Sequence, residues 1–288
     1  MVLKILKMNI RTLYSPAKIN LALNVVGKKG SLHKIESIVS FINLYDLIKL
    51  KEIRHKKHQI IFNGKFSKNI KRDNTITKLL NILDDRNLLK KKKFQIKITK
   101  NIPQRAGLGG GSMNAASLLS LFIKKNFFKI SSKKIREICD LIGSDVVLGI
   151  YKSNLILNSK GKISAFKTKK NFNIVLVKPK LGCSTKAIYS NVKKYSKAIF
   201  NKSKAGVFNL DKLSNLKNDL EPIALRKYSK LKQIKSHLEN YTKSKFVRMT
   251  GSGSVIVGYY LTKKDSELAK KYINKKFRNY WCIVAKTI

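Results

Sequence analysis

The sequence contains few acidic residues, few prolines and few cysteines, and it contains no long apolar run. Of its 288 residues, 15 are Asp or Glu and 63 are Lys or Arg, which gives a formal net charge of +48. The three cysteines lie far apart, so we expect reduced thiols and no thiolate metal site. No apolar stretch approaches the ~18 to 20 residues of a membrane span. We also expect no signal peptide, no membrane partner and a cytoplasmic location.

The positive charge alone would indicate a nucleic-acid-binding protein. However, only nine of the 63 basic residues are Arg, and the 54 lysines are spread along the whole chain. Surfaces that clamp phosphates or read bases favour the guanidinium fork of Arg. We therefore expect non-specific attraction to polyanions and no specific nucleic-acid partner, with a dedicated nucleic-acid role kept as an alternative. His55 and His58 lie in a lysine-rich stretch without other ligand types, which argues against a metal site there.

Apolar periodicity predicts a folded chain of mixed helices and strands. Apolar side chains alternate in residues 18–26 and 93–99, and they recur at helical spacing in residues 73–83. Further strands are expected at 172–179, 254–261 and 281–288, a hairpin at 153–166, and helices at 131–143, 185–199, 220–241 and 264–277. This mixture predicts an α+β protein, and its length allows two domains.

The most informative stretch is "NIPQRAGLGGGSMNAASLL", residues 101–119. Four glycines (Gly107, Gly109, Gly110, Gly111) separate a predicted strand from a predicted helix, and Ser112 stands where we expect the helix N-cap. Glycines allow the main chain to approach phosphate oxygens closely, and a helix N-terminus favours negative charge. The loop lacks both the Gly-Lys-Ser/Thr ending of a Walker A loop and the sixth-place glycine of G-x-G-x-x-G. It predicts a phosphate-binding loop of another kind.

The pattern P-x-x-A-G-L-G-G-G-S-x-N-A-A resembles the nucleotide loop of the GHMP kinases. Two further motifs of that family occur in the expected order, "SPAKINLALNV" at residues 15–25 and "RMTGSGSVIVG" at residues 248–258. The resemblance implies a small-molecule kinase that uses ATP and Mg²⁺. It also implies a two-domain fold. Residues 1–165 would form an ATP-binding domain like domain 2 of ribosomal protein S5, and residues 166–288 a ferredoxin-like domain.

The phrases "LYD" (44–46) and "NDLEP" (218–222) resemble those members of the family whose acceptor is a cytidyl-diphosphate alcohol of the non-mevalonate isoprenoid pathway. The family usually has Gly-Tyr-His-Glu where this chain has Ser31, Leu32, His33 and Lys34. Because Leu32 removes an aromatic platform for the base, a kinase that acts on another small alcohol stays open as an alternative.

The resemblance also assigns roles to individual residues. Lys18 and Asp145 would be catalytic, with Asp145 managing the proton of the acceptor hydroxyl and the charge of Lys18 keeping that carboxylate ionised. No direct protein ligand to the metal is assigned. The ATP-binding residues would be Pro103, Gln104, Arg105, Ala106, Gly107, Leu108, Gly109, Gly110, Gly111, Ser112 and Met113. The substrate-binding residues would be Asn20, His33, Thr185, Tyr189, Gly251 and Gly253.

Overall fold

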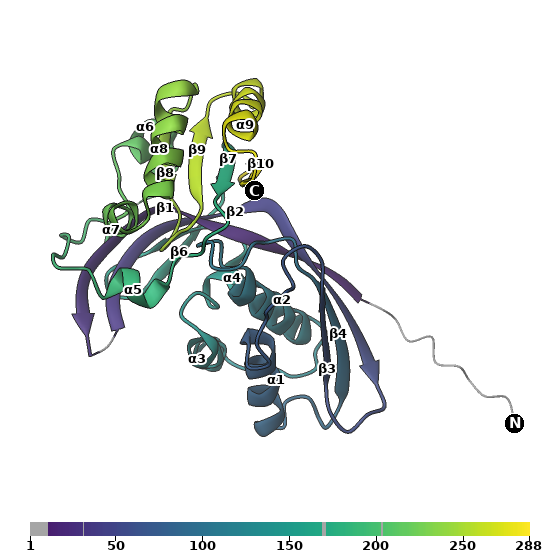
Figure 1. The fold of residues 1–288 in the computed structure, drawn as a ribbon. Helices are drawn as coiled ribbons and strands as arrows, with labels where there is room; N and C mark the ends of the chain where they lie inside the picture. Colours follow the sequence, from purple (N-terminus) through teal and green to yellow (C-terminus); the bar gives the residue numbers. More distant parts are fainter. Residues whose placement is uncertain (1–10, 31, 169–170, 203) are drawn as a thin grey trace, which may run out of the picture. The chain divides into compact units, whose positions relative to one another are not determined.

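The computed structural model describes residues 11–30, 32–168, 171–202 and 204–288, so most of the stretch considered for a signal peptide lies outside them (Figure 1). Two compact units divide the chain. The first unit takes the described part of Met1–Ala17 with Leu44–Pro103 and Gly110–Ile150, and the second takes Lys18–Asn43, Gln104–Gly109 and Tyr151–Ile288. The structure is mixed α and β, as the sequence predicts. A domain boundary between residues 165 and 166 stays a prediction.

Two long strands, β1 (Arg11–Lys29) and β2 (Leu32–Ile53), contribute residues to both units. In the first unit, residues 47–53 of β2 pair with β4, and β4 pairs in parallel with β3. In the second unit, residues 37–39 of β2 pair with β5, and β5 continues through a hairpin to β6. The bounds are β3 Gln59–Asn63, β4 Lys93–Thr99, β5 Asn154–Leu157 and β6 Ile163–Phe166.

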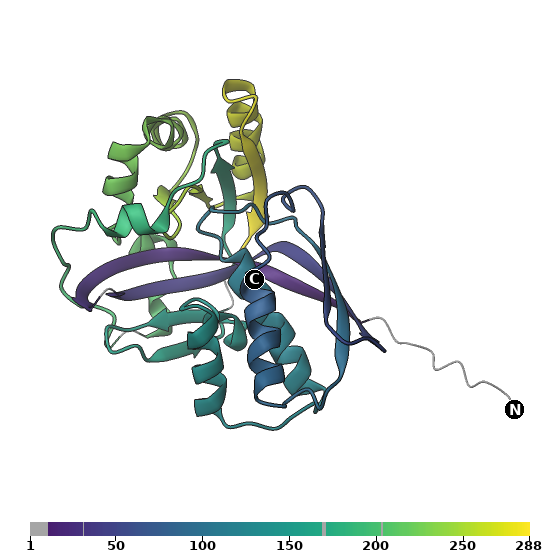
Figure 2. The same ribbon diagram turned by 60° about the horizontal axis from the view of Figure 1, so that its bottom comes forward.

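The helices of the first unit are α1 (Thr75–Asp85), α2 (Gly110–Lys124), α3 (Ser132–Ile142) and α4 (Leu148–Tyr151). Helix α1 packs against α2 and α3, and α1 and α2 lie side by side in both views (Figure 1, Figure 2). The buried face of α2 reaches β4, because the Phe122 ring lies 5.2 Å from that of Phe94. This packing fixes the helix that follows the glycine loop.

A second sheet, wholly antiparallel, has the strand order β10-β7-β9-β8 and lies in the second unit. Helices α8 and α9 pack against it (Figure 1) and bury residues such as Leu231, Ile234 and Ile273 with Val175 and Ile256. The bounds are β7 Asn173–Lys178, β8 Phe246–Met249, β9 Ile256–Tyr260, β10 Trp281–Lys286, α5 Thr185–Tyr189, α6 Leu210–Ser214, α7 Glu221–Lys227, α8 Ser229–Tyr241 and α9 Lys263–Lys276. Within the described residues, no helix combines the length and the apolar character needed to cross a membrane.

Two helix predictions were wrong in extent. The helix expected over residues 185–199 ends at Tyr189. Farther along the expected helix, the main-chain N–H groups of Ser196 and Ile199 donate to the carbonyl of Val25 and the carboxylate of Glu36, at 2.8 Å each, in place of helical hydrogen bonds. The helix expected over 220–241 is two helices, because Tyr228 adopts an extended conformation between α7 and α8. The strands expected at 93–99, 172–179, 254–261 and 281–288 and the helices α1, α3 and α9 are confirmed within two residues at each end. The strand expected at 18–26 is part of the longer strand β1, Arg11–Lys29.

The carboxylate of Asp46 on β2 is fully buried and organises the approach to the glycine loop. It forms an ion pair with Lys100 and accepts the main-chain N–H groups of Asn101 (2.7 Å) and Ile102 (2.9 Å). It also accepts the side-chain amide of Asn114 on α2, at 2.9 Å. Because four donors from two segments converge on one carboxylate, Asp46 ties the end of β4 to α2.

We expect Asp46→Ala to lower the free energy of unfolding by about 3–5 kcal/mol, because it leaves the Lys100 ammonium buried without its counter-charge. Glu52→Ala is the matched control. Glu52 lies on the same strand and pairs with Lys92, but both side chains are about half exposed, so the expected loss is about 1 kcal/mol or less. Guanidinium denaturation measures both values, and equal losses would contradict the role of Asp46.

Candidate active site

Residues 104–109 of the glycine loop lie against the turn that follows β8. A Cβ atom on Gly107 would lie 2.0 Å from the carbonyl oxygen of Thr250, and Gly107 has a φ of +75°. No other residue type fits there, because both the contact and the conformation exclude a side chain. The loop and the turn also pair through their main chains, since Ser254 and Val255 donate to the carbonyls of Arg105 and Ala106 at 3.2 Å each.

The turn itself contains the two glycines predicted from the third motif. Gly251 has a φ of +55° and Gly253 a φ of +82°. A Cβ on Gly251 would lie 3.3 Å from the Cα of Gly107 and 3.4 Å from Oδ1 of Asn20. Thr250, between β8 and Gly251, donates its hydroxyl to the carbonyl of Gly107 at 3.2 Å. The turn therefore holds the loop in place through main-chain contacts that leave no room for a side chain at Gly107.

Lys18 and Asn20 on β1 join the same group of residues. The main-chain N–H of Lys18 donates to the carbonyl of Leu108 at 3.0 Å, and a Cβ on Gly109 would lie 2.9 Å from the Lys18 side chain. The Lys18 Nζ atom donates to Oδ1 of Asn20 at 2.6 Å, and the main-chain N–H of Asn20 donates to the hydroxyl oxygen of Thr250 at 2.9 Å. Both side chains are buried, and a buried ammonium requires such polar neighbours.

In the first unit, helix α2 begins at Gly110, two residues before the predicted cap. The prediction that Ser112 is the N-cap was wrong, and Ser112 lies in the first turn. Glycine at the first position of α2 allows close packing, because a Cβ on Gly110 would lie 3.0 Å from the Ile102 side chain. The hydroxyl of Thr75 donates to the carbonyl of Gly111 at 2.7 Å. The first-turn N–H groups have no partners within the helix, and the helix dipole favours an anion in front of them.

The remaining side chains of the loop divide into inward and outward groups. Ala106, Leu108 and Met113 are buried and serve the core, so that only their main-chain atoms are available to a ligand. Gln104 and Arg105 are exposed. Pro103, also buried, ends the segment that Asp46 fixes.

Asp145 lies in the turn between α3 and α4 and is partly buried. Its carbonyl accepts the N–H of Leu148 at 3.2 Å, and the short helix α4 that follows packs closely on α2. A Cβ on Gly149 would lie 2.6 Å from that of Ala116. The turn that carries Asp145 is thus attached to the helix that begins with the glycines.

Three of the predicted acceptor residues, His33, Thr185 and Tyr189, lie outside the glycine turn in the second unit. The His33 ring lies 5.2 Å from that of Tyr189, and burial together with the positive charge of Lys28 lowers the His33 pKa. Thr185, at the start of α5, is hydrogen-bonded to the hydroxyl of Ser252 in the glycine turn at 2.9 Å. The turn and the acceptor residues are therefore connected.

Sequence reasoning missed three residues near these groups. Thr250 directly precedes Gly251, and Ser252 lies between Gly251 and Gly253, but the third motif drew attention to the glycines only. Tyr195 is half exposed, and its ring lies 6.4 Å from that of His33. No periodicity in the sequence points to Tyr195, because it lies in a loop held by distant partners. Among the described residues, no three His, Cys, Asp or Glu side chains gather as a metal site.

Comparisons with known proteins agree with this arrangement. Residues 74–153 match the family described as GHMP kinases N terminal domain. A solved 4-(cytidine 5'-diphospho)-2C-methyl-D-erythritol kinase has the same fold, with a TM-score of 0.79 at 19% identity over 96% of this chain and 99% of that one. A mevalonate kinase from L. major, solved with R-mevalonate, gives a TM-score of 0.71 at 13% identity, over 100% of this chain and 98% of that one.

Curated relatives are much closer in sequence. The 4-diphosphocytidyl-2-C-methyl-D-erythritol kinase of Pelagibacter ubique (strain HTCC1062) is 54% identical over 98% of this chain and 100% of its own length. That of Clostridium botulinum (strain Langeland / NCTC 10281 / Type F) is 34% identical over 91% and 95%. With its glycine loop, its glycine turn and this identity over nearly the whole length, the chain belongs to the 4-diphosphocytidyl-2-C-methyl-D-erythritol kinases of the GHMP kinase family.

Proposed function

We propose that the protein transfers the terminal phosphoryl group of ATP to a hydroxyl of 4-diphosphocytidyl-2-C-methyl-D-erythritol, in the cytoplasm and as a step of the non-mevalonate isoprenoid pathway. The observation that carries the proposal is the loop of residues 107–111, in which four of the five residues are glycines, in a chain 54% identical to a kinase named for that substrate. Use of ATP follows from membership of the kinase family.

The loop suits a polyphosphate. Gly109, Gly110 and Gly111 have no side chains. Gly110 and Gly111 begin the first turn of α2, whose main-chain N–H groups have no partners within the helix. The close contacts at Gly107 and Gly109 explain the glycines on the protein side of the loop. The hydroxyl of Ser112 is available to a phosphate or to Mg²⁺, and the bound cation would offset the charge of the phosphates.

Phosphoryl transfer depends mainly on positioning and on charge stabilisation. We assign to Asp145 the orientation of the acceptor hydroxyl and the acceptance of its proton as the new P–O bond forms. Lys18 would supply positive charge to the same reaction, and its ammonium is held by the amide oxygen of Asn20. On this assignment Asn20 acts through Lys18, and its own main chain is fixed by Thr250.

For the acceptor, we propose that the His33 and Tyr189 rings bind the cytosine base. Thr185, Gly251 and Gly253 would bind the remainder of the acceptor, because they border the glycine turn. Tyr195 offers further aromatic surface beside His33. Base stacking on aromatic side chains is worth about 1–3 kcal/mol.

Purified protein with ATP, Mg²⁺ and the cytidyl-diphosphate alcohol should release ADP. Asp145→Asn should lower kcat by about 10²- to 10⁴-fold while nucleotide binding persists, because a positioned proton acceptor contributes that much. Asp140→Asn is the control, since Asp140 lies on α3 and forms an exposed ion pair with Arg136 on the same helix. An unchanged rate for Asp145→Asn would refute its assignment, and no ADP release by the wild type would refute the function.

Gly107→Ala should raise KM for ATP at least about tenfold, because its Cβ would lie 2.0 Å from a main-chain oxygen and the loop must move. Gly161→Ala is the matched control. Gly161 has almost the same φ, +77°, but a Cβ there meets no atom within 4 Å, so only backbone strain of about 1–2 kcal/mol is added. Equal KM values for the two variants would show that the contact with Thr250 does not shape the nucleotide loop.

Tyr189→Leu should raise KM for the cytidyl-diphosphate substrate by about 5- to 150-fold and leave KM for ATP unchanged, because stacking with one base is lost. Tyr241→Leu is the control, since Tyr241 also lies 5.2 Å from a histidine ring, that of His237, but on α8. Homoserine and mevalonate complete the acceptor panel. If one of these replaces the cytidyl substrate, the enzyme is a GHMP kinase for another small alcohol.

A further inference from the structure

The segment of residues 217–221 is bound edge to edge to β1 in the second unit. Leu23 donates its N–H to the carbonyl of Lys217 at 3.0 Å and accepts the N–H of Asp219 at 2.9 Å. The carboxylate of Asp219 then accepts the N–H of Val25 at 2.8 Å. These three hydrogen bonds fix the segment in register with the strand that carries Lys18.

The side chain of Asn218 connects this segment to the glycine turn. It is 3% exposed, and its Nδ2 atom donates to the carbonyls of Met249 and Gly251, at 2.8 Å each. Its Oδ1 atom accepts the N–H of Leu220 at 3.0 Å. Both amide hydrogens are therefore used on the two carbonyls that flank Thr250, whose hydroxyl bonds to Asn20 and Gly107.

We propose that Asn218 is a positioning residue for phosphoryl transfer, which sets the glycine turn against the strand of Lys18 and Asn20. This inference rests on the proposed function. Asn218 acts through Thr250, because the hydroxyl of Thr250 holds the main chain of Asn20 and the carbonyl of Gly107 only if the turn stays in place.

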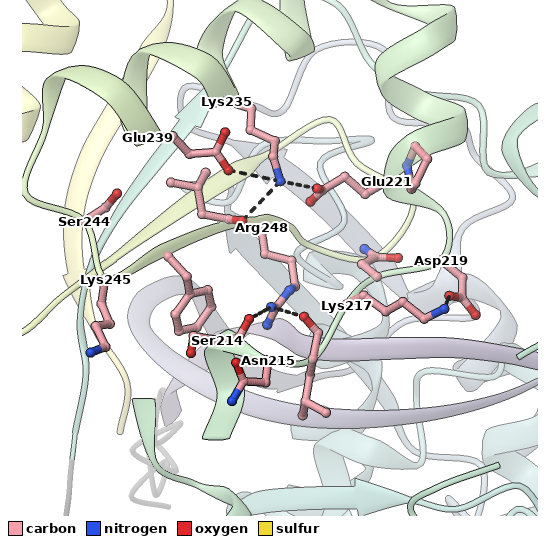
Figure 3. Close-up of a pocket in the computed structure, with 15 residues that line it drawn as sticks. Ser214, Asn215, Lys217, Asp219, Glu221, Lys235, Glu239, Ser244, Lys245 and Arg248 are labelled. Carbon is pink, nitrogen blue, oxygen red and sulfur yellow. Dashed lines mark hydrogen bonds and ion pairs between the residues drawn. The ribbon is translucent and has the colours of Figure 1, made fainter. Parts of the chain in front are cut away.

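Neighbouring charged side chains reinforce the same junction, as Figure 3 shows for the cavity of about 740 Å³ beside it. The carboxylate of Glu221 accepts the N–H of Met249 and pairs with Lys235. The guanidinium of Arg248 donates to the carbonyl of Leu21 on β1 and to that of Leu216. The end of β8 that leads into the turn is thus attached to residues 216–221 and to β1, and Asn218 also contacts the carbonyl of Gly251 within the turn.

Asn218→Asp tests the inference because it keeps the size and shape of the side chain. It removes both N–H donors and places a carboxylate against two carbonyl oxygens, which would repel the turn. The matched control is Asn154→Asp in the same unit. Asn154 is also buried, at 8% exposed, but it bonds to the hydroxyls of Ser40 and Thr168, away from the turn.

We expect Asn218→Asp to lower kcat at least about tenfold at a temperature where circular dichroism shows it folded, with Asn154→Asp within twofold of the wild type. Amide hydrogen exchange should accelerate at Asn20 and Gly253 in Asn218→Asp only. If Asn218→Asp matches the control in kcat and in exchange, the inference is overturned. If the wild type does not turn over the substrate, the proposed function fails, and the exchange at Asn20 and Gly253 still decides the inference.

A second pair of variants covers the case in which Asn218→Asp does not fold. Thr250→Val removes the hydroxyl on which the positioning depends, and Thr250→Ser retains it. We expect Thr250→Val to lower kcat at least about tenfold and Thr250→Ser to stay within threefold of the wild type. When Asn218→Asp folds, the double variant with Thr250→Val should lose little beyond the worse single variant, because both act through one turn. The inference would be overturned if the kcat losses of the two single variants multiplied in the double variant, or if Thr250→Val and Thr250→Ser had equal kcat values.

Discussion

The contact between the main chains of the glycine loop and the glycine turn is the constraint on which this part of the second unit depends. Gly107 approaches Thr250 so closely that a Cβ would lie 2.0 Å from the carbonyl oxygen. Side chains normally keep main chains apart. Because the loop and the turn approach so closely, they are held together by main-chain hydrogen bonds and by the hydroxyl of Thr250. Such a contact limits the motion of the loop's main-chain atoms. A loop held by its own backbone can present its N–H groups to phosphate without relying on mobile side chains.

The scarcity of acidic residues gives each buried carboxylate a structural use. Only 15 of 288 residues are acidic, yet Glu36, Asp46, Asp219 and Glu221 all accept main-chain N–H groups. A carboxylate can accept several hydrogen bonds at once, and bonds from N–H to a charged oxygen are stronger than neutral ones. Each therefore attaches one segment of its unit to another: Glu36 and Asp46 bind loops to β2, Asp219 binds its segment to β1, and Glu221 binds α7 to β8. Loss of one such carboxylate cannot be compensated from nearby, because the surrounding charges are mostly lysines.

Sequence patterns predicted what local interactions determine. The buried stripe of α1, the extent of α3 and the alternation of β4 depend on residues a few positions apart, and the structure matches them. The failures have distant causes. The expected helix over 185–199 yields to Glu36, 163 residues from Ile199 along the chain. Thr250 and Tyr195 could not be singled out, because their partners come from other segments. The motifs located the glycines of the site, but the residues that hold them required the structure.

The net charge of +48 bears on function in a different way from the site. A diffuse field of lysines draws anions toward the protein over a distance of about 8 Å at physiological salt, and ATP, a cytidyl diphosphate and RNA all respond to it. Such a field cannot discriminate among them. On the proposed function, selection comes from short-range features, namely the main-chain N–H groups of the glycine loop and the rings of His33 and Tyr189. For that reason the charge supports a nucleic-acid role no better than it supports a kinase. The glycine loop distinguishes the kinase from the nucleic-acid alternative. A surface dedicated to RNA does not require main chains packed so closely that no side chain fits between them.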